Sequence, residues 1–268
     1  METCVDTSVR EVTDAEIAFY REHGWARFER LIAPELAMAA RAAVEARLLE
    51  RAEDDARITE GSLWRGWYFP GRDDGIEPIR SLAFSAALGR NAKRLVGRDV
   101  AIRYVADNLL VKMPSGHLAS APTGFHQDLV NFPFDRAGFL TFWIALDEVT
   151  PAQGALRFYD GSHKLGKLTQ TSPREGPSVP ELHPELAERC PLSPPLHLQP
   201  GDATVHSALT VHGAPENATE RPRWGLQLGY FPDDTRYTGA QFPGLFGPDM
   251  GLTTGEPFRH PNFPIVAA

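Results

Sequence analysis

The chain has 268 residues, a hydrophobic content of 42% and a formal net charge of -8 at pH 7. This composition suffices for one large β-rich domain, while the acidic balance argues against nucleic acid and membrane surfaces as partners and leaves small molecules. No apolar run reaches the length of a membrane span, and the first residues lack a secretory signal, so the sequence predicts a cytoplasmic protein. The two cysteines, Cys4 and Cys190, do not indicate a disulfide framework.

Helical patterns dominate the N-terminal part of the chain. Thr13-Asp14-Ala15-Glu16 is a capping box and Gly24 a stop signal, which together predict a helix over 14–23, followed by a short strand over 25–28. Pro34 opens an Ala-rich run that predicts a helix over 34–51. A third helix is expected over 81–95. Before it lie aromatic residues that either line a pocket or close the edge of a sheet, namely Trp64, Trp67, Tyr68 and Phe69.

The pattern changes to short strands from Val100 onward. Strands are predicted over 100–113, 124–130, 138–149, 154–159, 196–199, 202–212 and 223–231. Helices followed by many closely spaced strands indicate a mainly β fold with flanking helices, a jelly-roll barrel or double-stranded β-helix. We therefore expect a single domain over 1–268, with a helical part over 1–99, the barrel core over 100–231 and a covering tail over 232–268.

A first candidate site is His126-Gln127-Asp128. In an extended strand, residues two apart project to the same face, so His126 and Asp128 could bind one metal ion from one side. A third ligand would complete the facial arrangement that non-heme Fe(II) oxygenases use. The motif alone is weak, because random placement gives roughly one such match in this composition. A second match, His183-Pro184-Glu185, lies in a proline-rich surface excursion, and a hydrogen-bonded pair at a turn remains the alternative for the first.

Two histidines compete to be the third ligand, His206 and His212. Their even separation would place both on one face of an unbroken strand, so parity leaves both open. His212 precedes a turn and thus stands at a strand end, and Arg223 opens the next strand nearby. An arginine there suits the carboxylate of a co-substrate, because its guanidinium pairs with a carboxylate bidentately and keeps its charge. We favour His212 as the ligand and His206 as a supporting neighbour.

These elements together resemble the phytanoyl-CoA dioxygenase-like family of Fe(II)/2-oxoglutarate-dependent oxygenases, over roughly residues 13–231. They occur in the family's order: Lys112, His126-Gln127-Asp128, Trp143, Gly154, Gly161-Ser162-His163, Pro200-Gly201-Asp202, His212-Gly213, Asn217 and Arg223. The resemblance implies that His126, Asp128 and His212 bind Fe(II). It also implies that Arg223 anchors the distal carboxylate of 2-oxoglutarate in a pocket lined by Lys112, Gln127 and Trp143.

One position departs from the family pattern. The family commonly carries a serine two residues after the second histidine, where this chain has Ala214. A hydroxyl that could help hold the co-substrate is therefore missing, and Thr204 or Gln227 is expected to assist Arg223. Two further histidines have minor expected roles, His163 as a turn residue and His117 as a candidate contact with substrate.

The resemblance implies an enzyme that consumes O2 and 2-oxoglutarate and abstracts hydrogen from a C–H bond of a small organic molecule. Hydroxylation is the default outcome, and members that tailor bacterial natural products, including polyketides, also epimerise or close rings. This predicts a dioxygenase of antibiotic biosynthesis. The alternatives are an inactive barrel that binds a ligand and a redox-neutral zinc isomerase or hydrolase. We expect residues 164–195 or the tail from Pro232 to close the barrel mouth.

Overall fold

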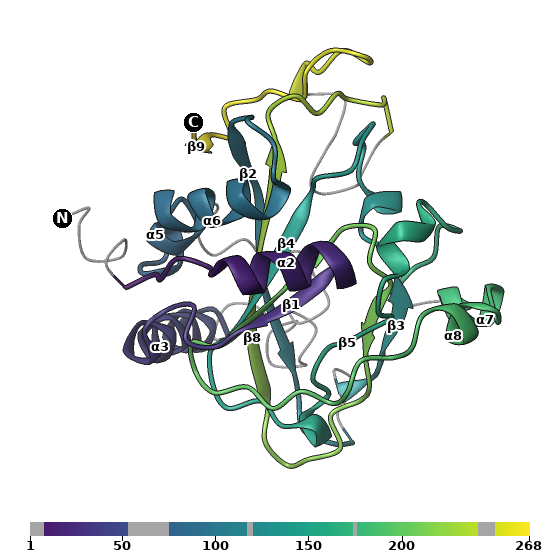
Figure 1. Ribbon diagram of the computed structural model, residues 1–268. Helices are drawn as coiled ribbons and strands as arrows, with labels where there is room; N and C mark the ends of the chain where they lie inside the picture. Colours follow the sequence, from purple (N-terminus) through teal and green to yellow (C-terminus); the bar gives the residue numbers. More distant parts are fainter. Residues whose placement is uncertain (1–7, 53–74, 117–119, 174–175, 241–249) are drawn as a thin grey trace.

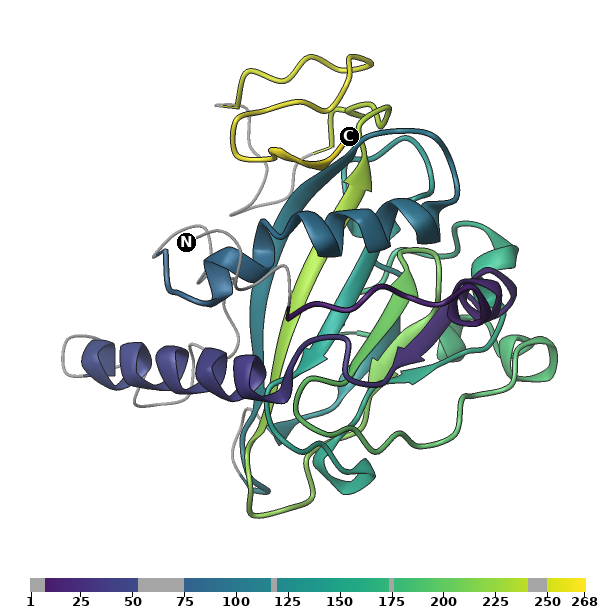
Figure 2. The same ribbon diagram turned by 60° about the vertical axis from the view of Figure 1, so that its left-hand side comes forward.

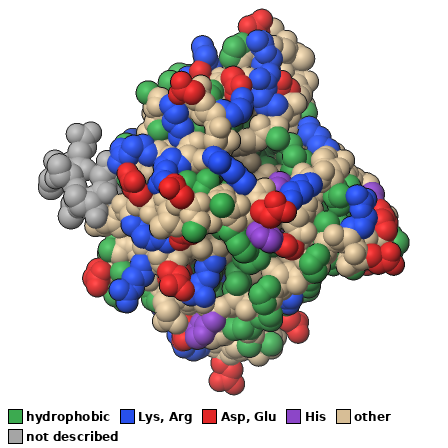
Figure 3. Space-filling view, in the orientation of Figure 1, with side chains coloured by type: hydrophobic (Ala, Val, Ile, Leu, Met, Phe, Trp, Pro, Cys, Tyr) green, Lys and Arg blue, Asp and Glu red, His purple; other side chains and the backbone are tan. Residues whose placement is uncertain are grey.

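The computed structural model describes residues 8–52, 75–116, 120–173, 176–240 and 250–268. The aromatic residues expected to line a pocket or close a sheet edge, Trp64, Trp67, Tyr68 and Phe69, lie outside the described residues, as does His117. Within the described part, no helix is long and apolar enough to cross a membrane. On the face shown in Figure 3, basic and acidic side chains are interspersed.

The first two predicted helices are confirmed. Helix α2 (Asp14–His23) begins at Thr13, whose hydroxyl accepts from the Glu16 N–H while the Glu16 carboxylate accepts from the Thr13 N–H. It ends at Gly24, which has a φ of +79°, and a Cβ there would lie 2.3 Å from His163 Nδ1. Helix α3 (Pro34–Ala52) starts at its proline as expected.

The third predicted helix is divided into α5 (Ile79–Ala83) and α6 (Ala86–Val96). Ser85 causes the division, because its backbone is extended and its hydroxyl accepts from the Leu88 N–H, which starts a new helix. Short helices occur in the later connections: η3 (Leu129–Asn131), η4 (Pro151–Gln153), η5 (Ser162–Leu165), α7 (Val179–Leu182) and α8 (Leu186–Arg189).

Two antiparallel sheets form the barrel (Figure 1). The six-stranded major sheet has the order β1-β6-β4-β8-β2-β9, with β1 (Trp25–Phe28), β2 (Ile102–Lys112), β4 (Leu140–Ala145), β6 (Ala203–Ser207), β8 (Arg223–Pro232) and β9 (Ile265–Ala267). The three-stranded minor sheet has the order β3-β7-β5, with β3 (Thr123–His126), β5 (Arg157–Phe158) and β7 (His212–Ala214). This arrangement confirms the mainly β, double-stranded β-helix class.

Several predicted strands are shorter in the structure. The strand expected over 124–130 ends at His126 and gives way to η3, and the segment 196–199 contributes only an isolated bridge between Val149 and Leu198. The strand expected over 202–212 is divided between the two sheets, as β6 and β7. In the turn between them, Thr210 Oγ1 donates to the Gly24 carbonyl oxygen at 2.6 Å. Because of this break, His206 and His212 belong to different sheets.

The two faces of the major sheet carry different sets of side chains, because side chains alternate along every strand. On one face, Phe142, Leu226, Leu228 and Tyr230 join the main hydrophobic core under the helices, and Figure 2 shows α3 and α6 lying along that side. The other face, called the inner face below, carries Thr141, Trp143 and the residues paired with them, and it points toward the minor sheet. The site described below lies between the two sheets.

The C-terminal segment packs against one end of the barrel. Phe258 and Phe263 are fully buried in a cluster with Phe134, Phe139 and Phe231. Strand β9 pairs with β2 and completes the edge of the major sheet. The single-domain organisation over 1–268, and a closing movement of the tail or of residues 164–195, stay predictions.

Candidate metal centre and co-substrate pocket

His126, Asp128 and His212 come together between the two sheets. Each offers one ligand atom, and these three atoms lie within 4.8 Å of one another. His126 on β3 and His212 on β7 are directly paired across the minor sheet, which sets their rings 4.3 Å apart between centroids. Asp128 follows two residues after His126, with Oδ1 at 3.5 Å from His126 Nε2 and 3.7 Å from His212 Nε2. In the described part of the chain, this is the only such cluster.

Both imidazoles turn the same nitrogen toward the centre of this cluster. His126 Nδ1 lies 2.8 Å from the Gly124 carbonyl oxygen, and His212 Nδ1 lies 3.0 Å from the Thr210 carbonyl oxygen. Because a carbonyl oxygen only accepts, each Nδ1 must carry the hydrogen, which leaves the Nε2 lone pair free. Backbone carbonyls commonly orient metal-binding histidines in this way. The donor set therefore fits a divalent first-row metal ion.

The pKa values of Asp128 and His212 are also shifted toward the forms that bind a metal ion. Burial alone would raise the pKa of Asp128, but the neighbouring His212, His126 and His206 outweigh it and hold this pKa well below its usual value. Burial, together with His206 and His126, lowers the pKa of His212 well below its usual value. At neutral pH the carboxylate is thus ionised and the His212 imidazole is neutral, the forms that bind metal ions.

The buried guanidinium of Arg223 lies on the inner face of the major sheet, the face that carries Thr141 and Trp143. Arg223 is 3% exposed, and burial lowers its pKa to about 9, so it stays charged at neutral pH. Its Nη1 donates to the Gly154 carbonyl oxygen at 2.5 Å, while its Nε is buried without a hydrogen-bond partner. No carboxylate in the described residues forms an ion pair with it. Since an unpaired buried charge is costly, Arg223 is suited to an anionic ligand.

Trp143 forms one wall beside this guanidinium. The two are neighbours on the inner face, and the ring covers Gly225, where an added Cβ would lie only 2.0 Å from Cζ2. Glycine at this position lets the indole lie close against strand β8. The indole nitrogen is buried without a partner. Trp143 thus provides an apolar surface and an unused donor beside the cation.

Lys112 is paired directly with Arg223 across β2 and β8. It is 5% exposed, and its ammonium donates to the Ala121 carbonyl oxygen. Burial, followed by the charge of Arg223, lowers the pKa of Lys112 to about 7, while Glu216 opposes the shift. Two cations held side by side reinforce the preference of this pocket for an anion.

Thr204 and Asn108 supply further unused polar atoms on the inner face. Thr204 stands opposite Trp143 across β6 and β4, and Asn108 stands opposite Gln227 across β2 and β8. Thr204 Oγ1 and Asn108 Oδ1 are both buried without a hydrogen-bond partner. Asn108 was not predicted as a site residue, although its position four residues before Lys112 on a strand places it on the same face. These orphan atoms indicate space for a polar ligand.

Gln127 lies differently from the expectation that it lines this pocket. Its amide nitrogen donates to the carbonyl oxygens of Gly166 and Leu209 at 2.9 and 2.6 Å, and its amide oxygen accepts from the Leu168 N–H at 2.8 Å. Gln127 follows the end of strand β3, and the segments that its amide contacts lie in connections outside the two sheets. Gln127 therefore ties three backbone segments together and has no polar group left for a co-substrate.

The remaining sequence candidates lie elsewhere. Ala214 ends strand β7 and is 2% exposed, so this position offers only a methyl group. His163 lies in η5 and its Nε2 contacts the Arg21 carbonyl oxygen at 3.2 Å, as expected of a turn residue. His183 forms an exposed contact with Glu185 and joins no metal-binding cluster in the described chain.

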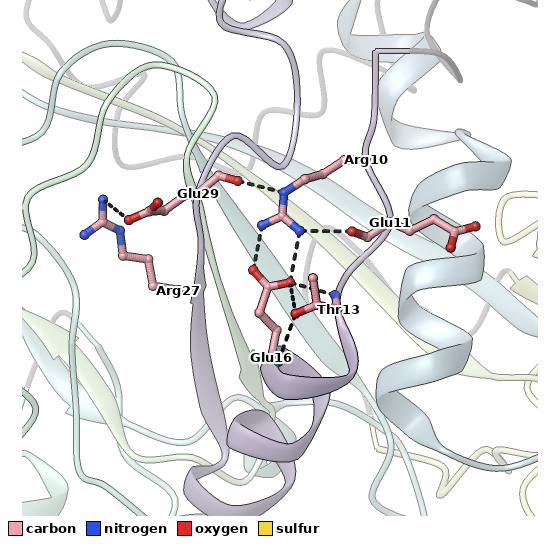
Figure 4. Close-up of a pocket in the computed structure, with 6 residues that line it drawn as sticks. All are labelled: Arg10, Glu11, Thr13, Glu16, Arg27 and Glu29. Atoms are coloured by element: carbon pink, nitrogen blue, oxygen red, sulfur yellow. Dashed lines mark hydrogen bonds and ion pairs between the residues drawn. The ribbon is translucent and has the colours of Figure 1, made fainter.

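A surface pocket away from the metal cluster is occupied by structural ion pairs and hydrogen bonds. It is lined by Arg10, Glu11, Thr13, Glu16, Arg27 and Glu29 (Figure 4). Arg10 pairs with the Glu16 carboxylate at 2.6 Å and donates to the Glu29 carbonyl oxygen at 2.7 Å. Arg10 therefore links the start of α2 to the segment after β1, and its charge is already paired within the protein.

Comparison with known proteins agrees with this geometry. Residues 20–225 match the family described as phytanoyl-CoA dioxygenase (PhyH). The chain belongs to the phytanoyl-CoA dioxygenase family. It is 29% identical over 155 residues to a probable phytanoyl-CoA dioxygenase of Caenorhabditis elegans, covering 56% of this chain and 49% of that protein. It is 31% identical over 175 residues to a methylphosphonate hydroxylase of Gimesia maris, covering 61% and 62% respectively.

Solved structures extend the likeness over nearly the whole chain. The carbocyclase SnoK of nogalamycin biosynthesis, described as non-heme and dependent on alpha ketoglutarate, has a TM-score of 0.73 and 23% identity, and the match covers 97% of this chain and 98% of SnoK. The epimerase SnoN in complex with Fe3+, alpha ketoglutarate and nogalamycin RO has a TM-score of 0.69 and 26% identity, covering 94% and 98%. The match to SnoK shows a shared fold.

Proposed function

We propose that this protein is an Fe(II)- and 2-oxoglutarate-dependent oxygenase that acts on a C–H bond of a small organic molecule. The observation that carries the proposal is the cluster of His126, Asp128 and His212, whose donor atoms lie within 4.8 Å of one another. Two imidazoles and one carboxylate with remaining open positions are the ligand set of non-heme Fe(II) oxygenases. Membership of the phytanoyl-CoA dioxygenase family supports the same reaction class.

The co-substrate site that we propose is formed by Arg223, Trp143, Lys112 and Thr204. Arg223 would bind the distal carboxylate of 2-oxoglutarate, because it is a buried cation without a carboxylate partner among the described residues. Lys112 adds a second positive charge beside it, and the Trp143 ring packs against the guanidinium. Thr204 contributes a hydroxyl that has no other partner and so takes the place of the serine missing at Ala214.

When bound with 2-oxoglutarate and O2, iron supplies the oxidant that removes a hydrogen atom from the substrate. The contribution of the chain is geometric and electrostatic. His126 and His212 hold their Nε2 lone pairs toward one point through their Nδ1 contacts with backbone carbonyls. Asp128 supplies the negative charge at the same point, and burial between the two sheets keeps bulk water away from the reacting atoms.

For the substrate, we propose a natural product of the polyketide type, in a bacterial antibiotic pathway. The similarity to SnoK and SnoN, both from nogalamycin biosynthesis, supports this class. The apolar surroundings of the metal centre are compatible with such a molecule. Leu129 follows Asp128 directly, and the half-buried Phe132 and Leu209 pack with it against the aromatic cluster. Hydroxylation, epimerisation and ring closure all begin with the same hydrogen abstraction.

The test is an anaerobic titration of the purified protein with Fe(II) and then 2-oxoglutarate. We expect a weak visible charge-transfer band when both are present, and its loss in His126→Ala, Asp128→Ala and His212→Ala. His197→Ala, at a histidine whose side chain is 53% exposed, is the matched control and should retain the band. Succinate release in air, measured against a panel of aromatic polyketides, would then identify the substrate.

The rival functions give different results in this titration. An inactive barrel that only binds a ligand would show neither the band nor succinate release. A zinc isomerase or hydrolase would bind zinc at the same residues and convert substrate without O2. Either result would contradict the proposal.

A further inference from the structure

The two oxygens of Asp128 have different surroundings. Oδ1 lies 3.5 Å from His126 Nε2 and 3.7 Å from His212 Nε2, so it is the oxygen that shares a centre with the imidazoles. Oδ2 lies 3.2 Å from Thr141 Oγ1 and 3.2 Å from His206 Nε2. We propose that Thr141 and His206 are positioning residues that clamp Oδ2, so that Asp128 binds the metal ion through Oδ1 alone.

The hydrogen positions in this clamp follow from the chemistry of the acceptor. An ionised carboxylate only accepts hydrogen bonds, so the Thr141 hydroxyl donates and His206 Nε2 carries a hydrogen. His206 Nδ1 is buried and has no hydrogen-bond partner in the described structure. The imidazole is therefore oriented by its Nε2 contact with Asp128, and its other nitrogen has no competing interaction.

Sheet register places both donors, because Thr141 on β4 and His206 on β6 are directly paired. Paired residues project to the same face of a sheet with their side chains close together. Thr141 is fully buried and His206 is 1% exposed. The His206 ring also packs against Phe158 and His212, with centroid distances of 5.7 and 4.0 Å. The clamp is thus built on rigid strands, as precise positioning requires.

Holding Oδ2 away from the metal has a consequence for the reaction, which rests on the proposed function. Three protein donors leave about three positions of an octahedral ion open. A chelating 2-oxoglutarate would take two of them and O2 the third. A carboxylate that bound through both oxygens would occupy one of these positions. The hydrogen bonds from Thr141 and His206 therefore keep the third position available.

The test compares matched variants loaded with Co(II), which reports its coordination through its visible spectrum. Thr141→Val removes the hydroxyl at nearly constant volume, while Thr141→Ser keeps it. His206→Leu removes the donor, while His206→Gln keeps an N–H near the position of Nε2. Co(II) affinity by calorimetry, the Co(II) absorption spectrum and the melting temperature without metal are measured for each variant.

We expect Thr141→Val and His206→Leu to bind Co(II) about 10- to 100-fold more weakly, as is usual when a residue that orients a ligand is lost. Their Co(II) spectra should change in shape and intensity, because the freed carboxylate can bind through both oxygens. The Ser and Gln variants should stay within about threefold of the parent protein, with its spectrum. This rescue would not occur if the residues served only to fill space.

Two results would overturn the clamp. One is an unchanged spectrum and affinity in a folded Thr141→Val variant, and the other is a loss in the Ser and Gln variants equal to that in Val and Leu. Failure of the proposed function looks different, because then the parent protein itself would not bind Co(II), or His126→Ala would bind it equally well.

Discussion

The guanidinium carbon of Arg223 lies 5.1 Å from the centroid of the Trp143 ring. The ring can hold this position because Gly225 has no side chain, and an added Cβ would lie 2.0 Å from Trp143 Cζ2. A cation packed on an indole face is favourable, and both groups keep hydrogen-bonding atoms free for a ligand. The position of Trp143 beside Arg223 therefore depends on the glycine at position 225.

A methyl group at position 225 tests this dependence. We predict that Gly225→Ala displaces Trp143, lowers the free energy of unfolding by about 1–3 kcal/mol and weakens 2-oxoglutarate binding. Co(II) affinity should change little, because His126 and His212 lie on the minor sheet and Asp128 follows β3. Chemical denaturation and calorimetry measure the three quantities. Unchanged 2-oxoglutarate affinity in this variant would separate Trp143 from the co-substrate site.

Arg223 should contribute strongly to co-substrate affinity. Arg223→Ala is expected to weaken 2-oxoglutarate binding to the metal-loaded protein by about 2–5 kcal/mol, because it removes one partner of a desolvated charge pair. Arg221→Ala is the control, since Arg221 is largely exposed and contacts Glu148 at 3.4 Å. A larger loss in Arg221→Ala than in Arg223→Ala would move the anchor to that residue.

Lys112 should make the affinity for 2-oxoglutarate depend on pH. Burial and the charge of Arg223 lower the pKa of Lys112 to about 7, with Glu216 opposing, so in the free protein the ammonium is lost as pH rises through this value. A dianionic ligand binds the protonated form better. We predict roughly tenfold weaker binding at about pH 8.5 than at about pH 6.5. The affinity of Lys112→Met for 2-oxoglutarate should hardly change over this pH range. If the affinity of this variant fell with pH as steeply as that of the parent protein, Lys112 would not be the cause of the pH dependence.

The same pKa shift has the opposite effect on stability. In the unfolded chain, lysine keeps its proton up to about pH 10.4, whereas folded Lys112 releases it above about 7. Between these values the unfolded state binds more protons, so the contribution of this residue to the free energy of unfolding rises with pH. Comparing the parent with Lys112→Met by denaturation at several pH values measures this contribution.

The tail is predicted to be a structural part of the barrel. Phe258 is fully buried among Phe134, Phe231 and Phe263, so Phe258→Ala should lower the free energy of unfolding by about 3–5 kcal/mol. Phe19→Ala, at an aromatic residue that is 42% exposed, is the control and should cost much less. If Phe258→Ala left stability unchanged and only reduced the coupling of succinate release to product formation, the tail would act as a lid instead.

Much of this protein follows from its sequence by local rules. The capping box at Thr13 and the proline at the start of α3 each act within a few residues, so they predict α2 and α3 correctly. The short spacing of His126 and Asp128 likewise brings both residues into one candidate metal cluster. The order of spaced motifs ending at Arg223 also indicates the family that the comparison confirms.

The tertiary structure decided what depends on contacts between distant segments. Parity could not separate His206 from His212, because the chain leaves the major sheet between them and only the pairing of β3 with β7 brings His212 beside His126. The place of Asn108 on the inner face and the pairing of Thr141 with His206 likewise follow from strand register, whereas the hydrogen bonds of Gln127 depend on how the connecting segments pack around it. Spacing along a strand determines which side chains share a face, but non-local strand pairing determines which faces meet, and the candidate metal centre lies where two faces meet.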